Sequence, residues 1–229
     1  AYWVNKNVLN SFDKGISIDS VSDFTGSQNI TANNNKYLRK WFEVSFNKIG
    51  NNQRWVPYAK GGEYRKYYGN IVDVVDWDDS AREFYERNST SNLLDPSNWY
   101  KEGITYTDIT TRGTGFRYLP KGCVFDKAGP SIVNVEDLYY FIALLNTKVI
   151  KYYLDFLNPT LHVQVKDIKN LPFLINKEKK QFVEKLSKEN INICKNDWDS
   201  YEISYDFSKH PLLKFHSNKV KYSFEQWEH

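Results

Sequence analysis

Residues 104–126, ITYTDITTRGTGFRYLPKGCVFD, decide the fold class of this chain. Gly113 and Gly115 separate the first apolar run from the second, and Pro120-Lys121-Gly122 separates the second from the third. Short runs rich in β-branched and aromatic residues, bounded by glycine and proline, are typical of strands. The stretch therefore predicts three short strands, at residues 104–109, 115–119 and 123–126.

The sequence before this stretch predicts more strands and one helix. Apolar runs indicate strands at 41–46, 55–58 and 71–75. Asp78-Asp79-Ser80 offers the side-chain oxygens that begin a helix, which we expect to run to about Asn88.

The sequence after it predicts two helices and a strand. From Leu138 to Phe156 apolar residues recur with a helical period, with Asn134 as the N-cap, a break at Asn146-Thr147 and an end at Asn158-Pro159. Residues 161–165 alternate like a strand. Residues 178–189 indicate a charged helix, and its expected apolar side carries Phe182, Val183 and Leu186.

Together these elements indicate an α+β fold, a twisted sheet or partial barrel of short strands flanked by a few helices. Residues 1–190 are the expected domain, and residues 191–229, polar and aromatic, are interpreted as a linker or docking arm. The 229 residues suit one large domain. Met is absent even at position 1 and nothing resembles a signal peptide, so we interpret the chain as a piece of a longer protein.

Composition further restricts the kind of protein and partner that the sequence indicates. The net charge of +3 is a weak indication of a polyanionic partner. Cys123 and Cys194 lie far apart, which predicts reduced thiols in a cytoplasmic protein. No apolar run has the length of a membrane span, so no membrane partner is expected.

Catalytic patterns are weak. The four histidines have no metal-ligand spacing with Cys or acids, so no metal site is predicted. Glu178-Lys179-Lys180 with Asp167 fits half of a nuclease motif but lies in a solvated charge run. The chain lacks the Asn/Asp-Pro-Pro-Tyr signature of amino-methyltransferases and a glycine loop for S-adenosylmethionine. We therefore predict no catalytic residue and no cofactor in this part of the protein.

Basic and polar residues gather beside glycine and aromatic residues in three loop regions, at 33–39, 60–67 and 107–121. Arg and Lys neutralise DNA phosphates, and Arg can pair with guanine through two hydrogen bonds. Whether the three groups cluster on one face decides between a DNA-reading surface and ordinary solvated loops. The candidate DNA-binding residues are Lys36, Arg39, Lys60, Gly61, Gly62, Arg65, Lys66, Arg112, Arg117 and Lys121.

These segments resemble adenine-specific DNA methyltransferases of the PglX type, which serve BREX phage defence. Residues 31–44 resemble the family segment TG-x-N-x-x-FLR-x-W-x-EV, with Ala32 where the family has Gly, and residues 55–68 are similar to W-x-PY-x-KGG-x-x-RKWYGN. Residues 104–132 are similar to a third family block, and residues 144–154 resemble the family helix LLNSK…YYL.

The resemblance implies a target-recognition domain with a TaqI-like specificity fold, closed by a strand and the turn Asp167-Ile168-Lys169-Asn170-Leu171-Pro172. It implies that double-stranded DNA is the partner. Arg65, Arg112 and Arg117 would contact phosphates or guanines, and Lys36, Arg39, Lys60 and Lys121 would contact phosphates. A methylase domain of the same chain would hold S-adenosylmethionine and the flipped adenine.

Two alternatives stay open at this point. The chain could be the specificity portion of a type II restriction enzyme, which would read DNA in the same way. It could instead be a protein-interaction module whose aromatic tail docks other defence-system subunits.

Overall fold

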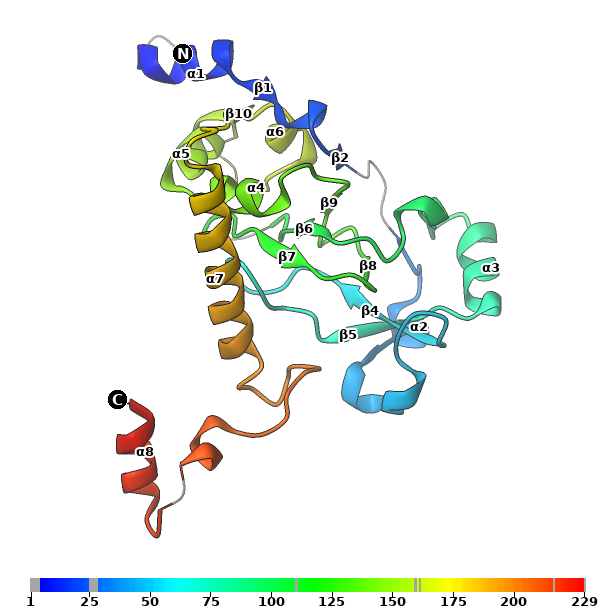
Figure 1. Cartoon of the computed structure of the whole chain (residues 1–229). Coiled ribbons are helices and arrows are strands. Elements are labelled where there is room, and N and C mark those ends of the chain that lie inside the picture. The colour runs from blue at the N-terminus through cyan, green and yellow to red at the C-terminus, as the bar shows by residue number, and fades with distance from the viewer. Residues whose placement is uncertain are drawn as a thin grey trace.

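The computed structural model of the chain describes residues 5–24, 29–109, 111–158, 160, 162–215 and 217–228. Its described strands form two four-stranded sheets and one two-stranded pair, and helices surround them (Figure 1). The mixed helix and strand content agrees with the prediction. The strands, however, form separate open sheets in place of a single twisted sheet or partial barrel.

The first four-stranded sheet has the order β2-β9-β6-β7, and all neighbours are antiparallel. The register places Thr105 opposite both Arg117 and Ser131. Ile104 and Ile132 are completely buried in the main core. The strands are β2 (Asp23–Phe24), β6 (Gly103–Thr105), β7 (Arg117–Leu119) and β9 (Ser131–Val133).

The second sheet has the order β3-β5-β4-β8, in which only the β4–β8 pair is parallel. Helix α3 (Asp79–Arg87) covers it and buries Tyr85 in a second core beside Val75. The Asp78 carboxylate accepts the Ala81 N–H at 2.8 Å, so the predicted N-cap and helix are confirmed. The strands are β3 (Leu38–Lys40), β4 (Trp55–Ala59), β5 (Asp73–Asp76) and β8 (Val124–Phe125).

The predicted strand at 41–46 is wrong. Strand β3 ends at Lys40, and two 3-10 helices follow, η2 (Trp41–Glu43) and η3 (Phe46–Lys48). The Lys40 N–H turns to the Glu43 carboxylate at 2.6 Å, so it is not available to a sheet partner. The remaining short elements before β5 are α1 (Lys6–Lys14), η1 (Ile18–Ser20) and α2 (Asn34–Tyr37), and η4 (Pro96–Asn98) lies before β6.

The predicted helix after Leu138 is present, and its predicted break is confirmed. It divides into α4 (Leu138–Leu145) and α5 (Lys148–Leu157), and the Thr147 hydroxyl caps α5 by accepting the Ile150 N–H at 3.2 Å. The predicted N-cap is wrong, because Asp137 takes the cap position. The Asn134 amide instead donates to the Asp23 carboxylate at 2.6 Å.

The predicted strand at 161–165 is wrong for its described residues, since Leu161 lies outside them. Val165 begins helix α6 (Val165–Lys169), and His162 forms one isolated bridge with Ile109. The Asp167 carboxylate accepts the Gln164 N–H at 2.9 Å, which starts a helix where alternation indicated a strand. Strand β10 (Pro172–Phe173) then pairs with β1 (Ile16–Ser17) and closes this end of the fold.

Helix α7 (Lys180–Trp198) runs along the sheets and packs on α4 (Figure 1). It extends beyond the expected boundary at residue 190, and Ile191 and Trp198 lie in the main core. The expected apolar side is wrong for Phe182 and Leu186, which are exposed. The buried stripe follows a helical period through Ser187, Ile191 and Trp198, and the partly buried Val183 continues it toward the start of the helix. Packing against the rest of the fold therefore buries a neighbouring side of the helix.

After α7 the chain first packs against residues 41–46 and then extends away from the sheets. The Trp41 indole N–H donates to the Ile203 carbonyl at 2.9 Å, and Tyr205 stacks on Phe46 with ring centroids 4.8 Å apart. Helices η5 (Pro211–Lys214) and α8 (Val220–Glu228) then extend away from the sheets (Figure 1).

Within the described residues, no helix combines the length and apolar character needed to cross a membrane. The same residues contain no cluster of three His, Cys, Asp or Glu side chains suited to a metal ion. Cys123 is buried and Cys194 half-buried, and both are free thiols.

Candidate nucleic-acid interface

Two of the three predicted groups meet in space. The loop after β4 lies against the loop between β6 and β7, because the Tyr67 N–H donates to the Phe116 carbonyl and the Tyr118 N–H donates to the Tyr67 carbonyl, both at 2.8 Å. The Thr107 hydroxyl donates to the Gly62 carbonyl at 3.0 Å. Gly115 permits this approach, since a Cβ there would lie 2.3 Å from the Arg65 carbonyl oxygen.

The Gly61-Gly62 pair shapes the first loop. Both residues have positive φ, 85° and 110°, in a region that side chains rarely adopt. A Cβ at Gly61 would lie 2.6 Å from the Ala128 carbonyl oxygen, so packing within the chain already requires glycine there. A contact between these backbone amides and a phosphate stays a prediction.

Arg117 is the most unusual residue of this region. It is 1% exposed. Among the described residues its Nε has no hydrogen-bond partner, and its side chain donates one hydrogen bond, to the Thr107 hydroxyl at 3.3 Å. In the described part of the chain, no carboxylate lies within ion-pair distance of it. Burial lowers the pKa of Arg117 to about 10, and the nearby Arg65 cation acts in the same direction. The guanidinium is therefore charged at neutral pH without a counter-charge.

Arg65 lies near the Arg117 cation and contacts the last turn of α7. Its guanidinium contacts the Asp197 carboxylate at 3.0 Å and lies over the Trp198 ring, 4.8 Å from the centroid. A cleft of about 480 Å³ lies beside this contact. Its lining residues include Lys40, Lys60 and Trp198. Residues beyond the expected domain boundary thus form one wall of the candidate interface.

Lys60, Lys66 and Arg112 flank this pair of arginines in different ways. Lys60 lies 4.0 Å from Asp126, whereas the Lys66 ammonium donates to the Asn146 carbonyl at 2.8 Å and so ties the loop to the α4–α5 junction. Arg112 is exposed and lines a hollow of about 400 Å³ with Tyr64.

Sequence reasoning missed two features of this site. Lys151 of α5 lines a small hollow together with Lys66 and Arg112, and its Cε lies 3.4 Å from where a Cβ of Gly113 would be. The Thr114 hydroxyl in the same hollow is buried and has no hydrogen-bond partner within the part of the chain that the structure describes. Lys151 is exposed on α5, at a position between the apolar residues of the helical period, and only the fold shows that it lies near this loop.

Lys36, Arg39 and Lys121 have local partners outside this cluster. Lys36 lies over the Tyr37 ring, 4.8 Å from its centroid, and Arg39 donates to the Asn35 and Leu38 carbonyls at 2.8 and 2.6 Å. Lys121 lies 3.5 Å from Glu102. The 33–39 group therefore does not join the other two, and its Asn33 caps α2 by accepting the Lys36 N–H at 3.1 Å.

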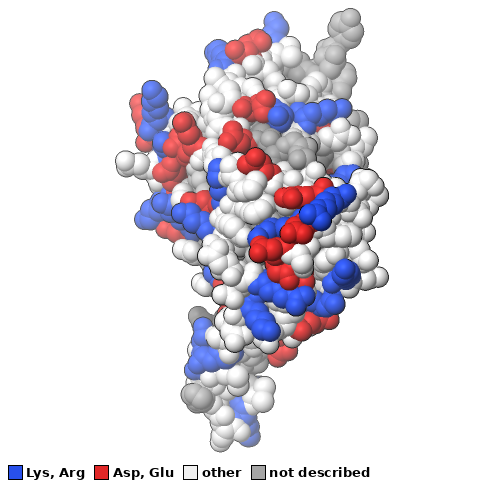
Figure 2. Space-filling view, turned by 90° about the vertical axis from the view of Figure 1, so that its right-hand side faces the viewer, with Lys and Arg blue, Asp and Glu red and all other residues white. Residues whose placement is uncertain are grey.

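The face of the molecule that carries α3 has a mixed charge. Figure 2 shows Lys and Arg interspersed with Asp and Glu on it, with no area dominated by one sign. Arg54–Asp76 and Arg82–Asp79 are two of its ion pairs. The cluster of Arg65 and Arg117 differs from this face, because among the described residues no carboxylate lies in ion-pair distance of Arg117.

Comparison with known proteins places this chain beside two curated relatives. No model of a known protein family matches it. It is 34% identical over 99% of its length to the adenine-specific methyltransferase BrxX of Escherichia coli O9:H4 (strain HS), and 30% identical over all of its length to the adenine-specific methyltransferase PglX of Lacticaseibacillus casei (strain Zhang).

The chain spans only about a fifth of the length of these relatives, 19% of the first and 21% of the second. Identity of this degree along the whole chain shows common descent with that segment. The chain therefore belongs to the family of BrxX and PglX adenine-specific methyltransferases, of which it matches one segment.

Proposed function

We propose that this chain is the target-recognition domain of an adenine-specific (N6) DNA methyltransferase, of the PglX type that serves BREX phage defence, and that it has a TaqI-like specificity fold. Its ligand is double-stranded DNA. The observation that carries the proposal is the buried, charged Arg117 beside Arg65, with no carboxylate in ion-pair distance of Arg117 among the described residues.

A buried cation without a counter-charge destabilises a fold unless something compensates it. A phosphate or a base edge would do so, because guanidinium forms paired hydrogen bonds with phosphates and with guanine. The loop backbone at Gly61-Gly62 and the Thr107 hydroxyl lie at the same place. We assign Arg65, which is partly exposed, to a phosphate, with the buried charge of Arg117 behind it, and Arg112, which is exposed on the next loop, to base reading.

The chemistry would belong to the remainder of the longer protein. In the described part, no strand leads through a glycine-rich turn into a helix, so these residues do not fit S-adenosylmethionine. A methylase domain in the same polypeptide would hold that cofactor and the flipped adenine, while this domain reads the flanking bases in the cytoplasm.

A segment exchange tests the proposal directly. The matching segment of Lacticaseibacillus casei PglX is replaced by this chain, and methylated adenines in the host DNA are mapped by sequencing. A recognition domain changes the methylated sequence, whereas a module that only binds protein leaves it unchanged. Because an inactive chimera would give no sequence, the isolated chain is also titrated with random-sequence duplexes at two salt concentrations.

The titration has its own readout. Binding that weakens with salt supports phosphate contacts. After selection of a preferred site, Arg112→Ala should relax preference at one position, at a cost of about 1–3 kcal/mol. Equal weakening for all sequences would assign Arg112 to a phosphate, and unchanged binding would remove it from the interface.

One observation favours a second function, docking to protein. Tyr222, Phe224 and Trp227 of α8 are between 43% and 46% exposed, and the helix extends away from the sheets. Exposed aromatic groups of this kind favour a protein interface. Other defence-system subunits, or the rest of the same polypeptide, would be the partners, and deletion of α8 would then abolish docking while DNA binding persists.

A further inference from the structure

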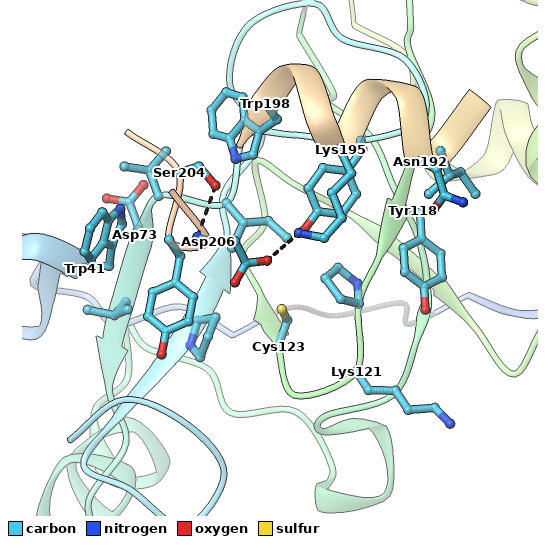
Figure 3. Close-up of a pocket in the computed structure, with 18 of the residues that line it drawn as sticks. Trp41, Asp73, Tyr118, Lys121, Cys123, Asn192, Lys195, Trp198, Ser204 and Asp206 are labelled. Atoms are coloured by element: carbon cyan, nitrogen blue, oxygen red, sulfur yellow. Dashed lines mark hydrogen bonds and ion pairs between the residues drawn. The ribbon is translucent and has the colours of Figure 1, made fainter. Parts of the chain in front are cut away.

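A cavity of about 490 Å³ lies between α7, the end of β7 and residues 204–206 (Figure 3). Its volume is within the range of small-molecule sites, roughly 300–1,000 Å³. We name it the α7 cavity. Its lining residues include Tyr68, Tyr118, Cys123, Asn192, Lys195 and Tyr205. It is separate from the Arg117 guanidinium, which is not among its lining residues.

Ordered aromatic rings form the walls of the α7 cavity. Tyr118 stacks on Tyr139 with ring centroids 6.3 Å apart, and Tyr205 stacks on Phe46. Each ring therefore has one neighbour that fixes its plane. Fixed aromatic faces and an apolar floor favour a flat, aromatic ligand.

Two polar side chains in the cavity are available for hydrogen bonds. Tyr68 and the exposed Asn192 are lining residues of the cavity, and neither the Tyr68 hydroxyl nor the Asn192 amide has a hydrogen bond to another described residue. Burial raises the pKa of Tyr68 to about 12, so its hydroxyl remains a donor at neutral pH. An Asn amide can pair with the N6 and N7 edge of adenine.

The charges of the cavity disfavour a cationic ligand. Lys188 lies over the Tyr139 ring at 4.5 Å and Lys195 over the Tyr68 ring at 5.2 Å, so lysines already occupy two aromatic faces. The carboxylates are paired as well: Asp73 pairs with Lys40, and Asp206 pairs with Lys195 (Figure 3). A neutral or anionic group fits this balance better than a cation.

We propose that the α7 cavity binds an adenine nucleotide, with the base between the aromatic walls, its edge on Asn192 and Tyr68, and its phosphate toward Lys188. Two sources would supply this chemistry, a free nucleotide or an adenine unstacked from a DNA strand. Neither source requires Arg65 or Arg117, which are not among the lining residues of the cavity.

The test is a titration of the chain with AMP, followed by saturation-transfer NMR and tryptophan fluorescence. We expect AMP to bind and tetramethylammonium not to bind. Tyr68→Phe and Asn192→Leu should each weaken AMP binding about three- to tenfold, because each removes one hydrogen bond to the base. Asn196→Leu, one turn further along the same helix and outside the lining of the cavity, is the matched control, with no expected effect.

The outcomes separate this site from the proposed DNA interface. Arg117→Met should leave AMP binding unchanged even if it abolishes duplex binding. A duplex with one bulged adenosine that displaces AMP, where the fully paired duplex does not, identifies DNA as the source; no displacement identifies a free nucleotide. No AMP binding at millimolar concentration, or equal binding by wild type, Tyr68→Phe and Asn192→Leu, would overturn the proposal.

Discussion

The 33–39 segment and the cluster around Arg117 have the same kinds of residues but different surroundings. In the first, Arg39 donates to backbone carbonyls and Asn33 caps a helix, so their polar groups are satisfied within a few residues. In the second, Arg117 is buried beside a second cation with no carboxylate of the described chain close to it. Residue type alone did not distinguish them, whereas the partners of each side chain do.

Arg117→Met tests this comparison with the largest expected effect. The substitution keeps an apolar stem of similar length and removes the charge. We expect duplex binding to weaken by roughly 1–3 kcal/mol and the salt dependence to fall by about one counterion. The free energy of urea unfolding should be unchanged or higher, since an uncompensated buried charge is removed.

Arg39→Met is the matched control in the 33–39 segment. It should leave duplex affinity unchanged and lower stability only slightly, because the lost hydrogen bonds are local and partly exposed. A large stability loss in Arg117→Met, or equal loss of DNA affinity in both variants, would show that the two regions do not differ as described.

Asp78→Ala tests a charged residue on the side of the molecule that carries α3, where the Asp78 carboxylate stabilises the fold by capping that helix. Loss of the N-cap of α3 should lower the free energy of unfolding by about 1 kcal/mol without changing DNA affinity. Burial opposes the charged form of Asp78, but hydrogen bonds from Ala81 and Ser80 outweigh it and lower its pKa. The difference between wild type and variant is therefore largest at neutral pH and becomes smaller as pH falls through that lowered pKa, because the protonated side chain keeps only a neutral capping oxygen.

Urea unfolding at pH 7 and near pH 2 measures that dependence. Asp78→Asn, which retains a capping oxygen, should lose less stability at pH 7 than Asp78→Ala. A difference that persists unchanged at the lower pH would show that the charged cap is not what stabilises α3.

Asp197→Asn tests the cluster around Arg117 through Arg65, whose ion pair with Asp197 it removes. The Asp197 carboxylate contacts Arg65 at 3.0 Å and would compete with a phosphate for it. Both side chains are partly exposed, so we expect duplex binding to strengthen only about two- to fivefold. Asp79→Asn, next to Arg82 on α3, is the control and should have no effect on anisotropy titrations.

Local patterns in the sequence predicted the elements whose structure depends on neighbouring residues. Strand β4, helix α3 and the break at Asn146-Thr147 were each predicted, because turn residues and capping oxygens act over a few positions. The apolar side of α7 and the strand at 161–165 were wrong. There, packing against α4 and a carboxylate cap at Asp167 overrode the pattern.

The candidate site likewise has a part that the sequence predicted and a part that only the structure reveals. Glycine, aromatic and basic residues in one loop indicated Gly61, Gly62 and Arg65, and the structure brings that loop against the Arg117 strand. The partner of Arg65 lies 132 residues further along the chain, in a segment interpreted as a linker. No local pattern reports a contact of that separation, so Asp197 and Trp198 could be found only in the fold.

Ala32→Gly has the smallest expected effect and returns to the 33–39 segment. Ala32 has φ of 58°, in the left-handed region. A side chain in this region is strained, whereas glycine adopts it freely but loses more entropy on folding. The two effects partly cancel, so we expect thermal or urea unfolding to show stabilisation of about 0.5 kcal/mol. Duplex affinity should stay the same, because we expect the 33–39 segment to stabilise the fold and not to contact DNA. A clear gain in affinity without a gain in stability would instead show that the 33–39 segment is part of the DNA interface.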